Sequence, residues 1–313
     1  AFAIGNAVLI KPAFEGIGEA LLIAECFSRA GVPDGLVNVV ACRRDVTGHL
    51  VSHPDVALVT LTGGTAAGNA LASAAGAKPF IGELGGNSAN IVCADADLQD
   101  AAERIVPSAF EASGQQCISA QRIIVEESAV EEFLGHFIAA AKALKVGDPT
   151  LPETDVGPMV NVANADRVEQ MVAEAVAEGA TAVLPLKRDN AIIHPTILLE
   201  PPRQARVVAE EIFGPVAVVI AAKDVNNAIA IANDSSFGLQ SSCFTSSLET
   251  AFRMSEELHV GSLWINEGSR FRMDTTPFGG VGDSGYGREG VKYAMQELSY
   301  LKFTGIRFPG REA

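Results

Sequence analysis

The amino-acid sequence predicts an α/β protein built on mainly parallel sheets. Three observations predict this class: short β-branched runs alternate with amphipathic helical patterns, capping residues and glycines mark the ends of those patterns, and no internal repeat or low-complexity stretch interrupts them. Parallel strands joined by helices are buried on both faces, so their runs are expected to be almost wholly apolar. A length of 313 residues is enough for two domains with substantial cores.

The expected elements follow one another in a regular order. Strands are predicted at residues 36–40, 56–61, 90–92, 122–125, 216–220 and 262–265. Helices are predicted at residues 18–30, 65–75, 98–112, 129–144, 165–178, 225–232 and 248–257. Asp97 and Ser247 precede two of these helices as N-caps, and Gly31 and Gly179 follow helix ends.

Composition and charge exclude several classes of protein. The 23 basic and 38 acidic side chains give a formal net charge of −15, which would repel nucleic acids and anionic membranes. The longest apolar runs are too short to span a bilayer. Five scattered cysteines without a CxxC pair are typical of reduced thiols in the cytoplasm. His49 and His53 form a close pair without a third ligand nearby, so we expect no metal site.

Two glycine-containing segments have the spacing of phosphate-binding turns. Gly280–Gly285 fits GxGxxG, but a Thr-Thr-Pro-Phe loop precedes it where the dinucleotide fingerprint needs a strand, so we interpret it as a flexible loop. Thr62, Gly63 and Gly64 are better placed, because they follow a predicted strand and open a helix whose N–H groups would face a phosphate. A plain tight turn explains this second spacing equally well.

Cys117 is the candidate nucleophile. No GxSxG elbow, P-loop or HExxH motif is present, so nucleophilic chemistry falls to the cysteines. Cys26, Cys42, Cys93 and Cys243 lie in, or at the end of, apolar helix or strand patterns, where cysteine usually acts as a small hydrophobe. Cys117 lies instead in a polar, glycine-containing loop, which is the setting of a reactive thiol.

Glu83 is the candidate general base. It is an acid set among apolar residues and glycines at residues 82–87. If the side chain is buried, its pKa rises towards that of a useful base. The alternative is a solvated turn acid without a catalytic role.

These motifs together resemble the NAD(P)-dependent aldehyde dehydrogenase superfamily. Glu-Leu-Gly-Gly at 83–86, Gly-Gln-x-Cys at 114–117, Glu-Glu-Ile-Phe-Gly-Pro at 210–215 and Pro-Phe-Gly-Gly at 277–280 occur in the order of that family. The resemblance implies a Rossmann-like cofactor domain at residues 1–84, an α/β catalytic domain at 85–296 and an oligomerisation tail at 297–313. It also implies a homodimer or homotetramer.

The resemblance implies roles for individual residues. Cys117 would attack the carbonyl of a small aldehyde, and Glu83 would activate the water that hydrolyses the resulting thioester. NAD or NADP would be held by a set of residues on both domains: Lys11, Thr62, Gly63, Gly64, Glu211 and Phe213. Asn266 would line the substrate funnel.

Arg270 and Arg272 precede the Pro-Phe-Gly-Gly motif, at the mouth of the family's substrate tunnel. Similar Phe-Arg-x-Asp segments occur in members that act on lactaldehyde and phosphonoacetaldehyde. One interpretation assigns these arginines to an anionic group on the substrate. The favoured interpretation is a local ion pair with Asp274.

The sequence departs from the family pattern at several positions. The family's oxyanion Asn and first cofactor-domain strand would precede Gly5, so we expect these residues to belong to a longer chain. Phe14 stands where NAD-preferring members carry Glu, which leaves the choice of cofactor open, and Asn87, Gly282 and Tyr300 also differ from the usual residues. These departures keep two alternatives: a catalytically silent nucleotide-binding homologue and a structural subunit.

Overall fold

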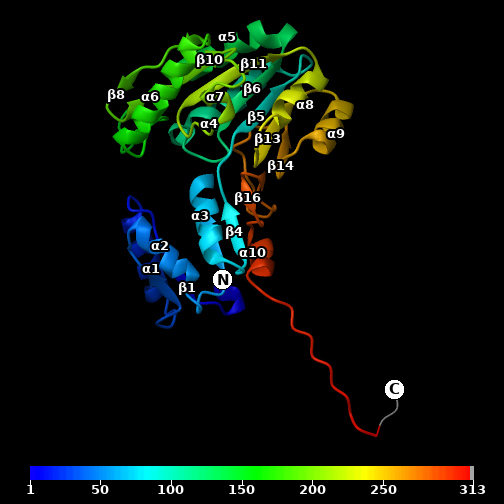
Figure 1. The fold of residues 1–313 in the computed structure, drawn as a ribbon. Helices are drawn as coiled ribbons and strands as arrows, with labels where there is room; N and C mark the ends of the chain where they lie inside the picture. Colours follow the sequence, from blue (N-terminus) through cyan, green and yellow to red (C-terminus); the bar gives the residue numbers. More distant parts are fainter. Residues whose placement is uncertain (311–313) are drawn as a thin grey trace.

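A computed structural model describes residues 1–310 and shows a larger and a smaller lobe joined at a narrow waist (Figure 1). The larger lobe is built on a seven-stranded sheet with the order β14-β13-β5-β6-β11-β10-β7. Six of its strands are parallel, and β7 is an antiparallel edge strand. The strands are β5 (Ser88–Val92), β6 (Ala120–Glu126), β7 (Thr181–Leu184), β10 (Thr196–Leu199), β11 (Val216–Ala222), β13 (Gln240–Phe244) and β14 (Ser262–Ile265).

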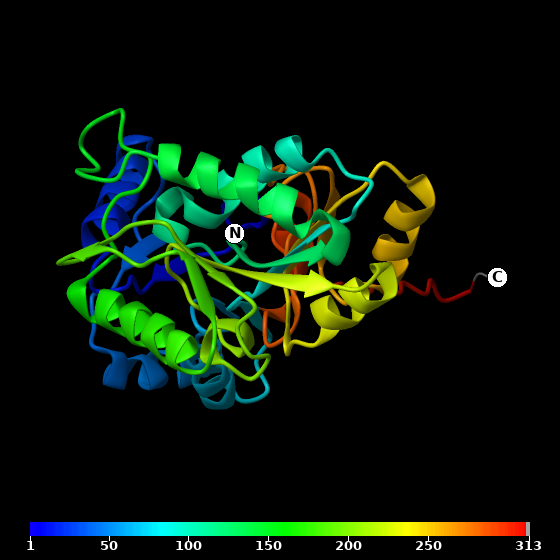
Figure 2. The same cartoon turned by 90° about the horizontal axis from the view of Figure 1, so that it is seen from above.

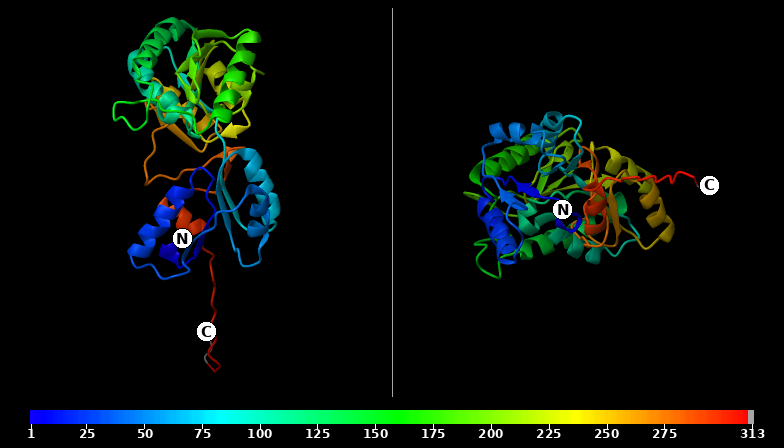
Figure 3. Two further views of the ribbon diagram at one scale, coloured as in Figure 1. Left: turned by 90° about the vertical axis from the view of Figure 1, so that its left-hand side faces the viewer. Right: turned by 90° about the horizontal axis from the view of Figure 1, so that it is seen from below.

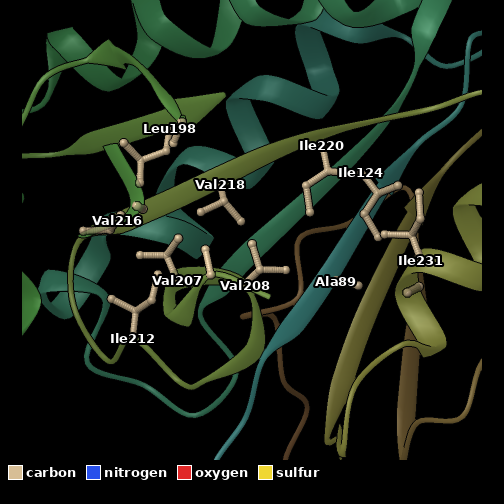
Figure 4. Packing of buried hydrophobic residues seen from close by; sticks show 14 of the residues in the cluster. Ala89, Ile124, Leu198, Val207, Val208, Ile212, Val216, Val218, Ile220 and Ile231 are labelled. Carbon is tan, nitrogen blue, oxygen red and sulfur yellow. The ribbon is translucent and has the colours of Figure 1, made fainter. Parts of the chain in front are cut away.

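Helices cover both faces of this sheet, and Figure 2 shows α5 and α6 on opposite sides of β11. One face carries α4 (Leu98–Phe110) and α5 (Val130–Ala143), whose Phe133 and Phe137 rings stack with centroids 5.4 Å apart. The other face carries α6 (Val162–Ala177), α7 (Arg206–Ala209), α8 (Val225–Asn233) and α9 (Leu248–Glu257). Figure 4 shows the core on this second face, where Val207, Val208 and Ile212 pack against Val218 and Ile220 of β11.

The smaller lobe repeats short strand–helix units. β1 (Val8–Ile10) and β2 (Val37–Val39) form one parallel pair beside α1 (Ile17–Arg29) and α2 (Arg44–Ser52). β3 (Val59–Thr62) and β4 (Phe80–Glu83) form another, joined through α3 (Thr65–Ala75). Its buried apolar cluster is limited to Val51, Val59 and Ala75, far smaller than the clusters of the larger lobe.

The chain returns to the smaller lobe near its end. β16 (Gly285–Tyr286) pairs with β4, and α10 (Val291–Glu297) follows it (Figure 3). Asn6 Nδ2 donates to the carbonyl of Leu298 over 2.9 Å. Val281 and Gly282, by contrast, pair with Gly238 and Phe237 of the second predicted domain, so this part of the chain contacts both predicted domains. The predicted boundaries at residues 84 and 296 stay a prediction. The remaining short elements are η1 (Phe2–Ile4), η2 (Glu111–Gly114), η3 (Glu127–Ala129), β8 (Arg188–Asp189), β9 (Ile192–Ile193), β12 (Phe237–Gly238) and β15 (Val281–Gly282).

Several sequence predictions are confirmed and others are corrected. The mainly parallel α/β architecture, the N-caps Asp97 and Ser247, and the bounds of α3, α9 and β14 are as predicted. The interpretation of Gly280–Gly285 as a flexible loop is wrong, because β15 and β16 lie within or overlap it and Gly285 packs against Gly82. No helix within residues 1–310 is long and apolar enough to cross a bilayer.

The C-terminal tail forms no strand within residues 299–310 of the single chain. Leu301 and Phe303 are almost fully exposed there. Its pairing with a partner's sheet stays a prediction, and residues 311–313 of the predicted tail lie outside the described residues.

Candidate active site

Cys117 lies at the waist, in a tightly held loop between α4 and β6. Ala112, Ser113 and Gly114 have φ angles of 52°, 57° and 64°, so three consecutive residues adopt the left-handed conformation and reverse the chain. Ser113 Oγ donates to the carbonyl of Gly157 over 2.8 Å. A Cβ on Gly114 would overlap a carbonyl oxygen of the 214–215 segment, so this position requires glycine.

The Cys117 thiol is surrounded by apolar side chains and carboxylates. It packs against the buried cluster of Ile118, Leu239 and Phe278. Burial raises the pKa of the Cys117 thiol to about 11, and the nearby negative charges, first of Glu211 and then of Glu83, act in the same direction. The thiol is therefore protonated at neutral pH in the cofactor-free chain.

Glu83 ends β4 at the same waist and is 4% exposed. Neither carboxyl oxygen has a hydrogen-bond partner among the described residues. Burial raises the pKa of Glu83 to about 8, and the charge of Glu289 adds to the effect, whereas Arg272 and Arg288 oppose it. The condition set for a raised pKa, burial of the Glu83 side chain, is met, so the alternative of a solvated turn acid is wrong, whereas its role as a base stays a prediction.

The turn formed by Thr62, Gly63 and Gly64 lies level with Glu83. Thr62 is the register partner of Glu83 between β3 and β4, and the N–H of Gly63 donates to the Glu83 carbonyl over 3.0 Å. Gly64 is the N-cap of α3 and provides no side-chain cap, and a Cβ on Gly64 would meet no neighbour within 4 Å. An uncapped helix N-terminus with open space before it fits a phosphate group.

Glu211 contributes a half-buried carboxylate to the waist from the opposite lobe. Its Oε1 accepts the backbone N–H of Gly86 over 2.8 Å. Burial raises the pKa of Glu211, whereas the Gly86 N–H and Arg167 act against that rise. Phe213 follows with φ of 48° and is partly exposed. Lys11 lies one residue beyond β1 and is half-buried.

The two glycines between the lobes bring these groups together. A Cβ on Gly86 would overlap the Cys117 carbonyl oxygen, so the backbone of residue 86 packs directly on the thiol loop. A Cβ on Gly85 would lie 3.1 Å from Glu211 Oε2 and 3.3 Å from Thr65 Oγ1. The thiol loop, the Glu211 carboxylate and the start of α3 thus meet around Gly85 and Gly86, where the chain crosses from the smaller to the larger lobe.

Arg270 and Arg272 lie near this crossing but do not pair with Asp274 as predicted. Arg270 forms an ion pair with Glu111, and its Nε donates to Gln116 Oε1 over 2.8 Å, beside the thiol loop. Arg272 pairs with Glu289 at 3.0 Å. Its guanidinium also lies 4.0 Å from the centre of the Phe278 ring. The favoured interpretation, a local ion pair with Asp274, is therefore wrong, because both carboxylate partners come from distant segments of the chain.

Asn266 and Cys117 lie at opposite ends of the parallel strands. Asn266 follows β14, at the carboxyl ends of the parallel strands, whereas Cys117 precedes β6 at their amino ends. Its amide is satisfied by the backbone of Thr245, with Nδ2···O at 3.0 Å and N···Oδ1 at 2.9 Å. The structure therefore gives Asn266 a role in joining strand ends, and the expectation that it lines the substrate funnel is not supported.

Three residues of this region were missed from the sequence: Gln121, Arg122 and Arg167. Arg122 is 3% exposed and donates to the carbonyls of Asn87, Ile231 and Ala232 at 3.0–3.2 Å, which ties the inter-lobe segment to the end of α8. An arginine and a glutamine inside a strand with otherwise apolar residues are the sequence signal for such buried bonds.

Comparisons with known proteins give a single consistent result. The sequence model of the aldehyde dehydrogenase family matches residues 1–304. The sulfoacetaldehyde dehydrogenase of Neptuniibacter caesariensis is 37% identical over 302 residues, which cover 96% of this chain and 66% of that protein. The 3-sulfolactaldehyde dehydrogenase of Priestia megaterium is 40% identical over 300 residues, which cover 96% of this chain and 63% of that protein.

The solved structures agree with these sequence relatives. The glyceraldehyde-3-phosphate dehydrogenase of Methanocaldococcus jannaschii, complexed with NADP, superposes with a TM-score of 0.92 at 38% identity and covers 96% of this chain and 67% of that one. An NAD-dependent aldehyde dehydrogenase from Sinorhizobium meliloti gives a TM-score of 0.92 at 32% identity, covering 98% of this chain and 62% of that one. The chain spans 60–66% of the length of the first three curated relatives.

Proposed function

The chain belongs to the aldehyde dehydrogenase family, and from this premise we propose that it oxidises a small aldehyde to its carboxylate with NAD or NADP. One observation carries the proposal: a half-buried thiol and a buried carboxyl with a pKa of about 8 share the waist with an uncapped helix N-terminus. This combination supplies a nucleophile, a base and a phosphate site.

Residues from both lobes fit the cofactor. The N–H groups at the start of α3, after Thr62, Gly63 and Gly64, would bind phosphate oxygens, and Lys11, Glu211 and Phe213 would contact the remainder. NAD or NADP supplies the hydride acceptor when bound. The acidic character of Glu211 suits ribose hydroxyl groups, because a carboxylate accepts their hydrogen bonds.

Cys117 forms and breaks the covalent bond. Its thiol gives its proton to water and the sulfur attacks the aldehyde carbon, and the Cys117 N–H would donate to the developing oxyanion. Loss of hydride from the thiohemiacetal leaves a thioester on Cys117. Ionised Glu83 then takes a proton from water, whose oxygen attacks the thioester carbon, and cleavage of the C–S bond releases the carboxylate and the thiol.

A single-turnover experiment separates the two roles. Wild-type chain mixed with cofactor and aldehyde should give a burst of NAD(P)H that Cys117→Ala abolishes. Glu83→Gln should keep the burst and slow the later turnovers, because hydrolysis follows hydride transfer. Cys26→Ala, at an exposed cysteine outside the site, is the control. A folded, cofactor-binding wild type without a burst would contradict the activity of this chain as it stands. The same experiment on the chain extended upstream through the oxyanion Asn would then separate a missing segment, if activity is recovered, from a catalytically silent homologue, if it is not.

We further propose that the aldehyde carries an anionic group. Arg270 and Arg272 are each only about one-third exposed and each pairs with a single carboxylate, so N–H donors remain for a ligand. The relatives named for sulfoacetaldehyde and 3-sulfolactaldehyde support this class. The double substitution Arg270→Ala and Arg272→Ala should raise KM for anionic aldehydes more than for neutral ones. An unchanged KM for anionic aldehydes would contradict this class.

A further inference from the structure

Gln121 joins the strand that follows the Cys117 loop to the segment that carries Glu211. It is the second residue of β6 and is 5% exposed. Its Nε2 donates to the carbonyl of Glu210 over 2.6 Å, and its Oε1 accepts the N–H of Ile212 over 2.8 Å. One side chain therefore satisfies backbone groups immediately before and after Glu211, where the chain forms neither helix nor strand.

The rest of this segment is anchored in the same way. Gln121 Nε2 also donates to the carbonyl of Val207, within α7, over 3.2 Å. Arg167 of α6 donates to the carbonyl of Ile212 over 2.5 Å. The side chains of Val208 and Ile212 point into the core beneath the sheet (Figure 4). With its neighbours fixed on both sides, the carboxylate of Glu211 has a defined place at the waist.

The contacts of Gln121, Glu211 and Gly86 and the chain from Cys117 to Gln121 form a closed loop. Glu211 Oε1 accepts the N–H of Gly86, and the backbone at Gly86 packs on the Cys117 carbonyl so closely that a Cβ there would overlap it. Cys117 is in turn four residues from Gln121 along the chain. A shift of Glu211 would therefore be transmitted through Gly86 to the thiol loop, and a shift of the thiol loop would be transmitted through Gln121 to Glu211.

We propose that Gln121 is a positioning residue that fixes the Glu211 carboxylate relative to the Cys117 thiol. The kinetic consequence rests on the proposed function, whereas the geometric part stands on the contacts alone. Burial and the charges of Glu211, Glu83 and Glu289 all act on the thiol. Of these three carboxylates, Gln121 bonds only to the segment of Glu211.

The first test follows the pH dependence of Cys117 alkylation by iodoacetamide in the cofactor-free chain, with Cys117 distinguished from other cysteines by peptide mass spectrometry. Glu211→Gln removes a charge that disfavours the thiolate, so alkylation below pH 9 should become faster, by about tenfold if the thiol pKa falls by one. Gln121→Met keeps the length of the side chain but loses all its bonds, and should move the profile in the same direction. Gln121→Asn is the milder variant should the Met variant fail to fold.

Asn233 provides a matched control. Its amide also bridges two backbone groups, the carbonyl of Glu257 at 2.8 Å and the N–H of His259 at 2.9 Å, but at the C-terminal ends of α8 and α9. Asn233→Ala should lower thermal stability without moving the alkylation profile. A Gln121 variant that loses stability but alkylates like Asn233→Ala would overturn the proposal.

The second test compares the two Michaelis constants. Displacement of Glu211 should raise KM for the cofactor and slow single-turnover hydride transfer by about 10²-fold, the effect of a misplacement near 1 Å. KM for the aldehyde should stay near the wild-type value, because no bond of Gln121 reaches the arginines at the tunnel mouth. A change in KM for the aldehyde alone would also overturn the proposal. If the wild type forms no NAD(P)H, the proposed function fails, and the alkylation profile still decides the role of Gln121.

Discussion

Replacement of Glu83 by Gln should remove a large pH dependence from the stability of the chain. Burial raises the pKa of Glu83 from its ordinary 4.5 to about 8, so the folded state binds this proton more tightly than the unfolded state does. The stability that the proton provides is complete below pH 4.5 and is lost as pH rises to about 8. Because a tenfold difference in proton affinity corresponds to about 1.4 kcal/mol, the full loss is about 5 kcal/mol.

Urea denaturation at about pH 5.5 and about pH 8.5 measures this effect. Between these values the free energy of unfolding of the wild type should fall by about 3 kcal/mol relative to Glu83→Gln, which carries no titrating proton. Glu178→Gln, at an exposed acid on the end of α6, should show no such difference from the wild type. In parallel, the hydrolytic step should accelerate as pH rises through about 8. Equal pH dependence in wild type and Glu83→Gln, with a hydrolysis midpoint near 4.5, would refute the reasoning.

Three further predictions concern packing. Gly86→Ala places a Cβ on the Cys117 carbonyl and should abolish the burst of NAD(P)H. Its control, Gly135→Ala, lies in open space within α5 and should raise the free energy of unfolding by up to about 1 kcal/mol. A Gly86→Ala variant that still gives the burst would contradict the close approach. Arg122→Lys cannot reproduce the forked bonds to three carbonyls and should lower the free energy of unfolding by about 2 kcal/mol, measured by urea denaturation; an unchanged midpoint would show that the fork is dispensable. Amide hydrogen exchange should be slower in β6 and β11 than in α1, because the smaller lobe buries few apolar residues; equal protection would contradict this.

The helices and strands that the sequence predicts best are those whose apolar residues repeat with the period of a helix or a strand. α3, α9 and β14 have the predicted bounds because capping residues and glycines mark their ends. β13 is absent from the predicted strand ranges, although Cys243 within it was placed in an apolar pattern, because the strand reads Gln-Ser-Ser-Cys-Phe yet is buried throughout. Its Ser242 hydroxyl donates to Asn90 Oδ1 on the neighbouring strand, and this pairing shows only when the strands are adjacent. A buried polar strand has no apolar signature to detect.

The site residues also fall into those that the local sequence indicates and those that only tertiary contacts show. Cys117 and Glu83 were found because each stands out chemically from its own neighbours in the chain. Gln121 and Arg167 act on a segment 45 to 91 residues away, so nothing near them in the sequence indicates their partners. The ion pair of Arg272 with Glu289 was missed for the same reason, since local spacing favoured Asp274. Local chemistry identifies reactive groups, whereas the groups that hold them depend on tertiary contacts.

The glycines of the motifs illustrate why a glycine-rich segment alone is weak evidence of a phosphate site. A Cβ on Gly86 would overlap the Cys117 carbonyl, one on Gly279 would lie 3.0 Å from Glu83 Oε1, and one on Gly285 would overlap the carbonyl of Gly82. Each glycine marks a place where two segments distant in the sequence approach too closely for a side chain. Gly64 is different, because a Cβ there meets nothing and the helix behind it is uncapped. Open space before free N–H groups, rather than glycine content, is therefore the feature that distinguishes the turn at the start of α3.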